Sequence, residues 1–184
     1  MRFFTLCAVL LLTASFVLAQ QNKPNPVAGV NTTAQSFTAT TLEGKTYKLE
    51  DLKGKIVVLN FWSTKCWACG EEISELNKLV DTYKNGNEVV FLGFAHQAKP
   101  QVEQFLKKNP FKYQIVPAGL QEMIVPYGIP LGNGFFDIEF PTHILINREG
   151  IIEVYQGGIK GAKAVRAKLE AIFKNEAAKS KIAE

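Results

Sequence analysis

The sequence predicts an α/β domain, in which helices flank a central mixed β-sheet and a β-hairpin stands at the N-terminal side. Two continuous apolar runs, 56–61 and 89–95, have the length and β-branched content of buried strands, and helical spacing occupies 70–84 between them. Two further apolar runs, 142–146 and 151–155, are separated by a turn that ends in glycine. A strand–helix–strand unit followed by a hairpin gives a mixed sheet.

The first elements follow from turn residues and apolar content. Residues 37–42 and 45–49 flank the pair Glu43-Gly44, which suits a two-residue hairpin turn. The run 56–61 has the sequence IVVLNF and shows little polar alternation. Such a run predicts a strand buried on both faces.

The later elements are justified by helical spacing and by helix-start and helix-stop residues. The helix over 70–84 ends before an Asn-Gly pair, and the run 89–95 is a second buried strand. Pro100 starts another helix, because proline is favoured in a first turn. The remaining predictions are an extended piece at 113–116, one or two helical turns at 121–127, irregular chain over 128–140 and a last helix over 161–175.

Composition limits the class of protein. The 184 residues are 47% hydrophobic and 21% charged, which indicates one globular domain and excludes a disordered chain or a coiled coil. The formal net charge is +4, but lysines and arginines do not cluster, so we expect no nucleic-acid partner. Three cysteines are too few for a disulfide-dense scaffold.

The first 19 residues predict a signal for export. A positive start and an apolar run precede small residues before Gln20, the layout of a secretory signal peptide; an uncleaved membrane anchor is the alternative. Cleavage would remove Cys7 and leave two cysteines in an oxidising compartment. The expected organisation is signal peptide 1–19, flexible leader 20–35, domain 36–176 and a fraying C-terminal tail 177–184.

The motif Cys66-Trp67-Ala68-Cys69 lies between the first buried strand and the following helix. Cysteines three residues apart at a helix start can form a disulfide, and the helix N–H groups favour negative charge on the first sulfur. Lys65 adds a neighbouring positive charge. We therefore expect Cys66 to be the exposed, readily ionised nucleophile and Cys69 the buried resolving thiol.

Two other interpretations of the cysteine pair remain open. A four-ligand zinc site would need two more Cys or His, and the only histidines, His96 and His143, are far apart in the sequence. A purely structural disulfide that closes so short a loop would stabilise the fold little.

Several motifs together resemble one family. They are Val-Val-Leu-Asn-Phe-Trp at 57–62, the Cys-x-x-Cys motif, Phe-Pro-Thr at 140–142 and Leu-Ile-Asn-Arg-Glu-Gly at 145–150. In these motifs the chain is similar to the exported TlpA/ResA-type thiol-disulfide oxidoreductases of the thioredoxin superfamily, over residues 37–173. The resemblance implies a thioredoxin-like fold.

The resemblance also implies roles for individual residues. Pro141 would be a cis-proline that faces the disulfide, and Phe140 before it would offer backbone groups to an extended partner peptide. Trp62 would cover the site, although a core aromatic is the alternative. Glu72 would tune the thiols, or it is an ordinary first-turn glutamate.

The chain departs from the family pattern at Ala68, where proline is frequent, and in bulky Trp67, which would contact a partner or shield the sulfur. Ser74 replaces a helix proline, and the segment 128–140 is longer than usual. These departures affect the redox potential and the choice of partner more than the chemistry.

The expected function is exchange of a redox-active Cys66–Cys69 disulfide, with no other cofactor, with protein thiols and disulfides in the periplasm or cell envelope. The resemblance implies a reductant fed by a membrane electron donor. A thiol peroxidase is an alternative, although Ser63 stands where that chemistry places threonine. A Cu(I)-binding module that uses both cysteines and His143 is another; the simpler interpretation of His143 is a strand histidine with a local hydrogen bond.

Overall fold

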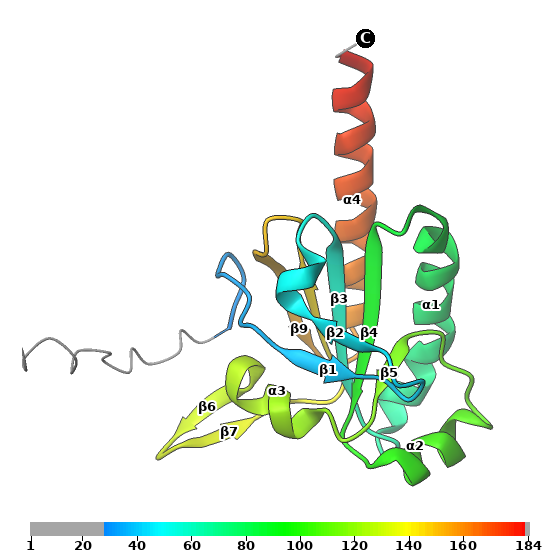
Figure 1. Ribbon diagram of the computed structural model, residues 1–184, viewed down its shortest axis with the longest axis vertical. Coiled ribbons are helices and arrows are strands. Elements are labelled where there is room, and N and C mark those ends of the chain that lie inside the picture. Colours follow the sequence, from blue (N-terminus) through cyan, green and yellow to red (C-terminus); the bar gives the residue numbers. More distant parts are fainter. Residues whose placement is uncertain (1–27, 183–184) are drawn as a thin grey trace, which may run out of the picture.

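The computed structural model describes residues 28–182 (Figure 1). The predicted signal peptide 1–19, with Cys7, and the first part of the predicted leader lie outside these residues. Residues 31–34 are bonded to the edge of the domain, since the Asn31 and Ala34 N–H groups donate to the carbonyls of Ile152 and Gly150. Among the helices within 28–182, none combines the length and the apolar character that a membrane span requires.

The centre of the domain is a five-stranded mixed sheet with the strand order β5-β4-β3-β8-β9. Strands β3, β4 and β5 are parallel, and β8 and β9 are antiparallel to their neighbours. The strand bounds are β3 Ile56–Trp62, β4 Val89–Ala95, β5 Gln114–Val116, β8 Thr142–Ile146 and β9 Ile152–Gly157.

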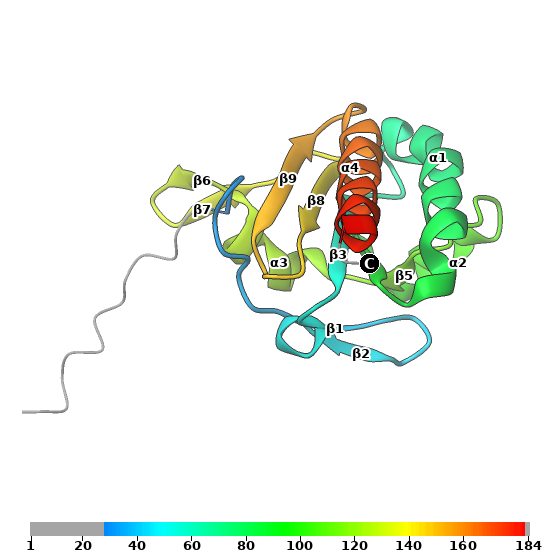
Figure 2. The same ribbon diagram turned by 90° about the horizontal axis from the view of Figure 1, so that it is seen from above.

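The other elements surround this sheet. The hairpin β1–β2 precedes it, and a second hairpin, β6–β7, projects from the side of the domain (Figures 1 and 2). The bounds are β1 Thr38–Thr40, β2 Thr46–Lys48, η1 Leu49–Leu52, α1 Trp67–Tyr83, η2 Lys84–Gly86, α2 Lys99–Leu106, α3 Leu120–Tyr127, β6 Ile129–Gly132, β7 Phe135–Asp137 and α4 Gly161–Ile182. The predicted fold class is confirmed.

The two faces of the sheet carry two separate cores, because alternate side chains of a strand point to opposite faces. In β3, Ile56, Val58 and Trp62 pack with α1, α2 and α4, whereas Val57 and Leu59 pack with the β1–β2 hairpin and α3. Figure 2 shows α1 and α4 on one side of the sheet and β1–β2 on the other. Burial on both faces explains why β3 carries almost no polar residue.

The largest differences from the sequence prediction are at the start of α1, within 128–140 and at the end of α4. Helix α1 begins at Trp67 rather than at residue 70, because Cys66 caps it. The segment 128–140 contains the hairpin β6–β7 instead of being irregular; residues 132–134, Gly-Asn-Gly, all have positive φ and form its tight turn.

Helix α4 also continues to Ile182, beyond its predicted end at 175, and includes residues of the predicted fraying tail. Arg148, in the β8–β9 turn, donates to both carboxylate oxygens of Glu176 at 2.9 and 3.0 Å. These hydrogen bonds hold the pKa of Glu176 below its ordinary value. The contact ties this part of α4 to the sheet, which the sequence pattern alone did not reveal.

The start of α4 packs so closely on the sheet that only glycine fits there. A Cβ added at Gly161 would lie 2.8 Å from Cγ of His143, and closer still to Cδ2. Gly70, in α1, is a matched contrast because a Cβ added there meets nothing within 4 Å.

We predict that Gly161→Ala lowers the free energy of unfolding by about 1–3 kcal/mol, the usual cost of overpacking a core. Gly70→Ala should raise it by about 0.5–1 kcal/mol, since alanine is the better helix former. Urea unfolding of both variants measures the difference. Equal stability of the two variants would contradict the close approach of α4 to His143.

Candidate functional site

The cysteine motif lies where β3 meets α1. Strand β3 ends at Trp62, a short loop follows, and α1 begins at Trp67. The parallel strand β4 ends at the same edge, where the His96 N–H donates to the Trp62 carbonyl at 2.9 Å. The carboxyl ends of parallel strands are the usual place for a functional site in an α/β sheet.

Cys66 and Cys69 form a disulfide with a Cα–Cα distance of 5.3 Å. Cys66 is the N-cap of α1, and its Sγ accepts a hydrogen bond from the Cys69 N–H at 3.1 Å. Cys69 is 4% exposed, whereas Cys66 is only partly buried. The helix start therefore presents the first sulfur to solvent and to the positive end of the helix dipole.

The loop before Cys66 is braced by a residue that sequence reasoning missed. The Gln97 side chain donates to Ser63 Oγ at 3.0 Å, and its Oε1 accepts from the Thr64 N–H at 2.9 Å. The same Ser63 Oγ accepts from the Lys65 N–H at 3.2 Å, and the Lys65 side chain is exposed. A polar residue two positions after a buried strand was the only sequence signal for Gln97.

The residues expected to meet a partner lie at the same edge. Trp67 is 77% exposed beside the disulfide. The Phe140–Pro141 peptide bond is cis, and Thr142, the next residue, pairs with Phe61 near the end of β3. Phe140 is half-buried, and its ring centroid lies 5.9 Å from that of His96.

Trp62 does not cover the site; the structure supports the alternative, a core aromatic. It is 1% exposed and belongs to the core cluster that contains Cys69. Its ring packs on Phe105 and Phe111, with centroid distances of 5.3 and 5.8 Å. The indole is one position further along β3 than Phe61, on the face covered by α1 and α2, so it supports the motif from within the core.

Polar side chains from three elements meet in this same core. Asn60 in β3 and His143 in β8 are register partners, and Glu72 comes from α1. The His143 Nε2 lies 2.9 Å from Glu72 Oε2, and the Asn60 amide nitrogen lies 3.3 Å from Nδ1 and 3.4 Å from Nε2. His143 is fully buried and Glu72 is 7% exposed. The sequence suggested a local hydrogen bond for His143 but gave no means of finding a partner 71 residues away.

The ligand set of the copper hypothesis is not brought together. Within residues 28–182, no group of three or more His, Cys, Asp or Glu is placed to hold a metal ion. His143 instead bonds to Glu72 and Asn60, and His96 is exposed at the end of β4.

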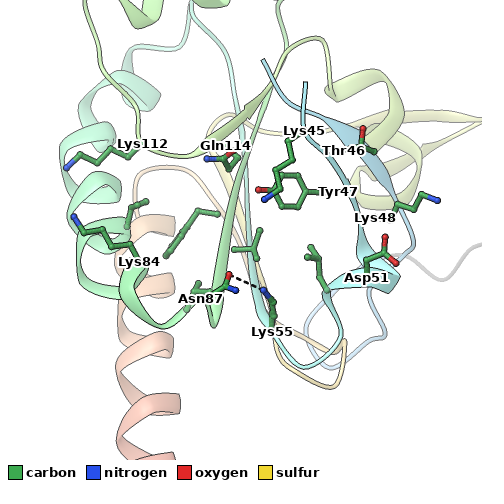
Figure 3. A pocket seen from close by; sticks show the side chains of 15 residues that line it. Lys45, Thr46, Tyr47, Lys48, Asp51, Lys55, Lys84, Asn87, Lys112 and Gln114 are labelled. Atoms are coloured by element: carbon green, nitrogen blue, oxygen red, sulfur yellow. Dashed lines mark hydrogen bonds between the residues drawn. The ribbon is translucent and has the colours of Figure 1, made fainter. Parts of the chain in front are cut away.

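A basic groove lies at the opposite end of the sheet, where β3 and β4 begin (Figure 3). Lys55 donates to Asn87 Oδ1 at 3.0 Å, and Lys84 and Lys112 both pair with Asp81. Its position separates it from the disulfide, so it is not part of the site.

An accessible sulfur at a helix N-terminus, linked to a buried second sulfur at the edge of a mixed sheet, defines a thioredoxin-fold thiol-disulfide oxidoreductase. Residues 30–155 match the AhpC/TSA family. The thiol-disulfide oxidoreductase ResA of Bacillus thuringiensis subsp. konkukian is 36% identical over 126 residues, which cover 67% of this chain and 68% of the relative. ResA of Geobacillus thermodenitrificans is 31% identical over 145 residues, 78% of each chain. The chain belongs to the AhpC/TSA family and, within it, to the ResA-type thiol-disulfide oxidoreductases.

Solved structures support the same fold. A thiol:disulfide interchange protein of the thioredoxin family from Chlorobium tepidum superposes with a TM-score of 0.62 at 24% identity, covering 76% of this chain and 94% of that chain. The thioredoxin domain of a thiol-disulfide oxidoreductase from Bacteroides vulgatus gives a TM-score of 0.60 at 20% identity, covering 78% and 97%.

After reduction of the disulfide, we predict that iodoacetamide alkylates Cys66 at least about tenfold faster than Cys69, because only the Cys66 sulfur is both accessible and capped by the helix N–H groups. Peptide mapping after limited alkylation of the native protein measures the ratio. In urea the two rates should converge. Equal labelling of the native protein would contradict the assignment of Cys66 as the accessible sulfur.

Proposed function

We propose that this protein reduces disulfides of client proteins in the cell envelope, with Cys66 as the nucleophile and Cys69 as the resolving thiol. The observation that carries the proposal is the position of Cys66, which caps α1 with its sulfur while Cys69 is buried one turn further on. A reduced Cys66 at this position would have its negative charge stabilised by the Cys69 N–H and the helix dipole.

The reaction would proceed in two exchanges. The Cys66 thiolate attacks one sulfur of a client disulfide, forms a mixed disulfide and releases the other client sulfur as a thiolate. Cys69 then loses its proton and attacks Cys66 Sγ, which releases the second client sulfur. The client gains two electrons, and the protein is left with the Cys66–Cys69 disulfide.

The surface around Cys66 suits an extended client segment. Phe140 would offer its backbone to the client beside cis-Pro141, in the manner of strand addition. Trp67 supplies an exposed aromatic face next to the attacking sulfur, and Lys65 supplies a positive charge that favours the thiolate. We propose that Glu72, on the buried side of the disulfide, tunes the pair of thiols.

Export and the electron donor belong to the same proposal. Residues 1–19 have the pattern of a signal peptide, and the relatives are named ResA thiol-disulfide oxidoreductases. A donor in the membrane would return two electrons to the Cys66–Cys69 disulfide after each turnover. The redox direction follows from the family resemblance, and the reduction potential decides it.

The purified protein should reduce insulin disulfides with multiple turnovers when dithiothreitol supplies electrons. Cys66→Ser should abolish turnover, because it removes the attacking sulfur, and Cys69→Ser should stop after the first exchange. The turbidity of the released insulin chains gives the rate. Turnover that survives Cys66→Ser would overturn the proposed role of Cys66.

The reduction potential of the Cys66–Cys69 pair should lie near that of thioredoxin, about −270 mV, as a reductant requires. Equilibration with defined mixtures of reduced and oxidised dithiothreitol, followed by thiol trapping and mass spectrometry, measures it. A potential near −120 mV, the value of a strong oxidant, would reverse the proposed direction while leaving disulfide exchange in place.

A further inference from the structure

His143 is a buried titratable group that the exchange reaction above does not use. It has no exposed surface and lies two residues after cis-Pro141, in β8. Its ring is enclosed by Glu72 of α1, by Asn60 of β3 and by the glycine that begins α4. Burying an imidazole and a carboxylate together is costly unless their polar atoms are paired, so the arrangement calls for a function or a compensating contact.

The contacts assign the protons of this pair. A carboxylate only accepts hydrogen bonds, so the nitrogen that faces Glu72, Nε2, carries a proton and donates at 2.9 Å. The Asn60 amide nitrogen only donates, which leaves Nδ1, 3.3 Å away, as its acceptor. With the Glu72 carboxylate as acceptor, the contacts fit an imidazole that donates through Nε2 and accepts through Nδ1. An imidazolium would carry a proton on Nδ1 as well, and this N–H group would face the N–H donor of the Asn60 amide.

The side chains that neighbouring elements contribute near the His143–Glu72 pair are a tyrosine, an arginine that is paired elsewhere and an uncharged glutamine. Tyr113, which precedes β5, faces Glu72: burial, and then the Glu72 charge, raises the pKa of Tyr113. In α4, the Arg166 guanidinium forms a salt bridge with Glu75, with 2.5 Å between Arg166 Nη2 and Glu75 Oε1. On the remaining strand, β9, the residue opposite His143 is Gln156, an exposed and uncharged side chain.

Only one of the two Glu72 oxygens is engaged. Oε2 accepts from His143, whereas Oε1 is buried and meets no hydrogen-bond donor within the described part of the chain. Glu72 follows Cys69 by three residues in α1, so both side chains lie on the same buried face of that helix. Oε1 is thus an unpaired buried acceptor on the face of α1 that also carries Cys69.

We propose that His143 is a positioning residue for disulfide exchange: it holds Glu72 as an oriented carboxylate whose free Oε1 takes the proton of Cys69. This inference rests on the proposed roles of Cys69 and Glu72. In the resolving step, the Cys69 thiol gives its proton to Glu72 Oε1, and its sulfur attacks Cys66 Sγ in the mixed disulfide. The Cys66–client bond breaks, the client leaves as a thiolate, and Glu72 later returns the proton to solvent.

The reaction of the reduced protein with 5,5′-dithiobis(2-nitrobenzoate) separates the two exchanges. Attack by Cys66 releases the first thionitrobenzoate, and attack by Cys69 on the mixed disulfide releases the second. Stopped-flow absorbance between pH 5 and 9 gives a rate–pH profile for each phase. The second phase is the readout for His143, and the first phase is an internal control.

We expect His143→Leu, which removes the donor, to slow the second phase about tenfold near neutral pH, because Glu72 Oε1 is then no longer held in place to accept the Cys69 proton. The first phase should change less than twofold. His143→Gln keeps an N–H donor and should stay within about threefold of the parent protein. In a Glu72→Gln background, His143→Leu should add less than a twofold effect.

An unchanged second-phase profile in folded His143→Leu would overturn the proposal, and so would an equal loss with and without Glu72. If the leucine variant does not fold, His143→Asn, whose amide is too short to reach Glu72, is expected to show the same loss. Failure of the proposed function would look different: in the parent protein itself, the second release would be absent or would depend on the reagent concentration, because Cys69 would then react only directly with a second reagent molecule.

Discussion

The hydrogen bond from the Cys69 N–H to Cys66 Sγ is the contact on which the site depends. It exists because β3, buried on both faces, ends at Trp62 and the chain turns directly into α1 with Cys66 as the cap. A helix N-terminus has unsatisfied N–H groups, and here a sulfur occupies the place of the usual capping oxygen. The same cap leaves Cys66 accessible and Cys69 buried, so one local geometry underlies both the proposed order of attack and the charge stabilisation.

The two-sided sheet determines which residues surround the disulfide. The alternation in β3 sends Asn60 and Trp62 to the face covered by α1, and the antiparallel register of β8 sends His143 to the same face. Helix α4 can approach that face because its first residue, Gly161, has no side chain. Loops form the outer edge of the site. Gln97 braces the loop before Cys66, and Phe140 immediately precedes the cis-proline.

Much of the fold could be predicted from the sequence because it depends on short-range patterns. The runs that became β3, β4 and β8 were found within one residue, and Cys66 and Cys69 were placed correctly at the strand–helix junction. The Glu72–His143 pair could not be predicted, since it depends on strand register and on helix packing across 71 residues. For Trp62 the sequence left burial in the core as an alternative, because an aromatic beside a motif fits a core or a surface equally well. The hairpin within 128–140 was missed, because glycines permit a turn as readily as a loop.

The central claim is that the Cys66–Cys69 bond exchanges with outside disulfides rather than bracing the fold. The most direct measurement is non-reducing mass spectrometry of Cys69→Ser after incubation with native insulin, whose disulfides are intact. A covalent adduct joined through Cys66, formed by Cys69→Ser but not by Cys66→Ser and released by dithiothreitol, is the predicted result. Absence of any adduct on a folded Cys69→Ser protein, with its Cys66 thiol shown to be free, would contradict the account.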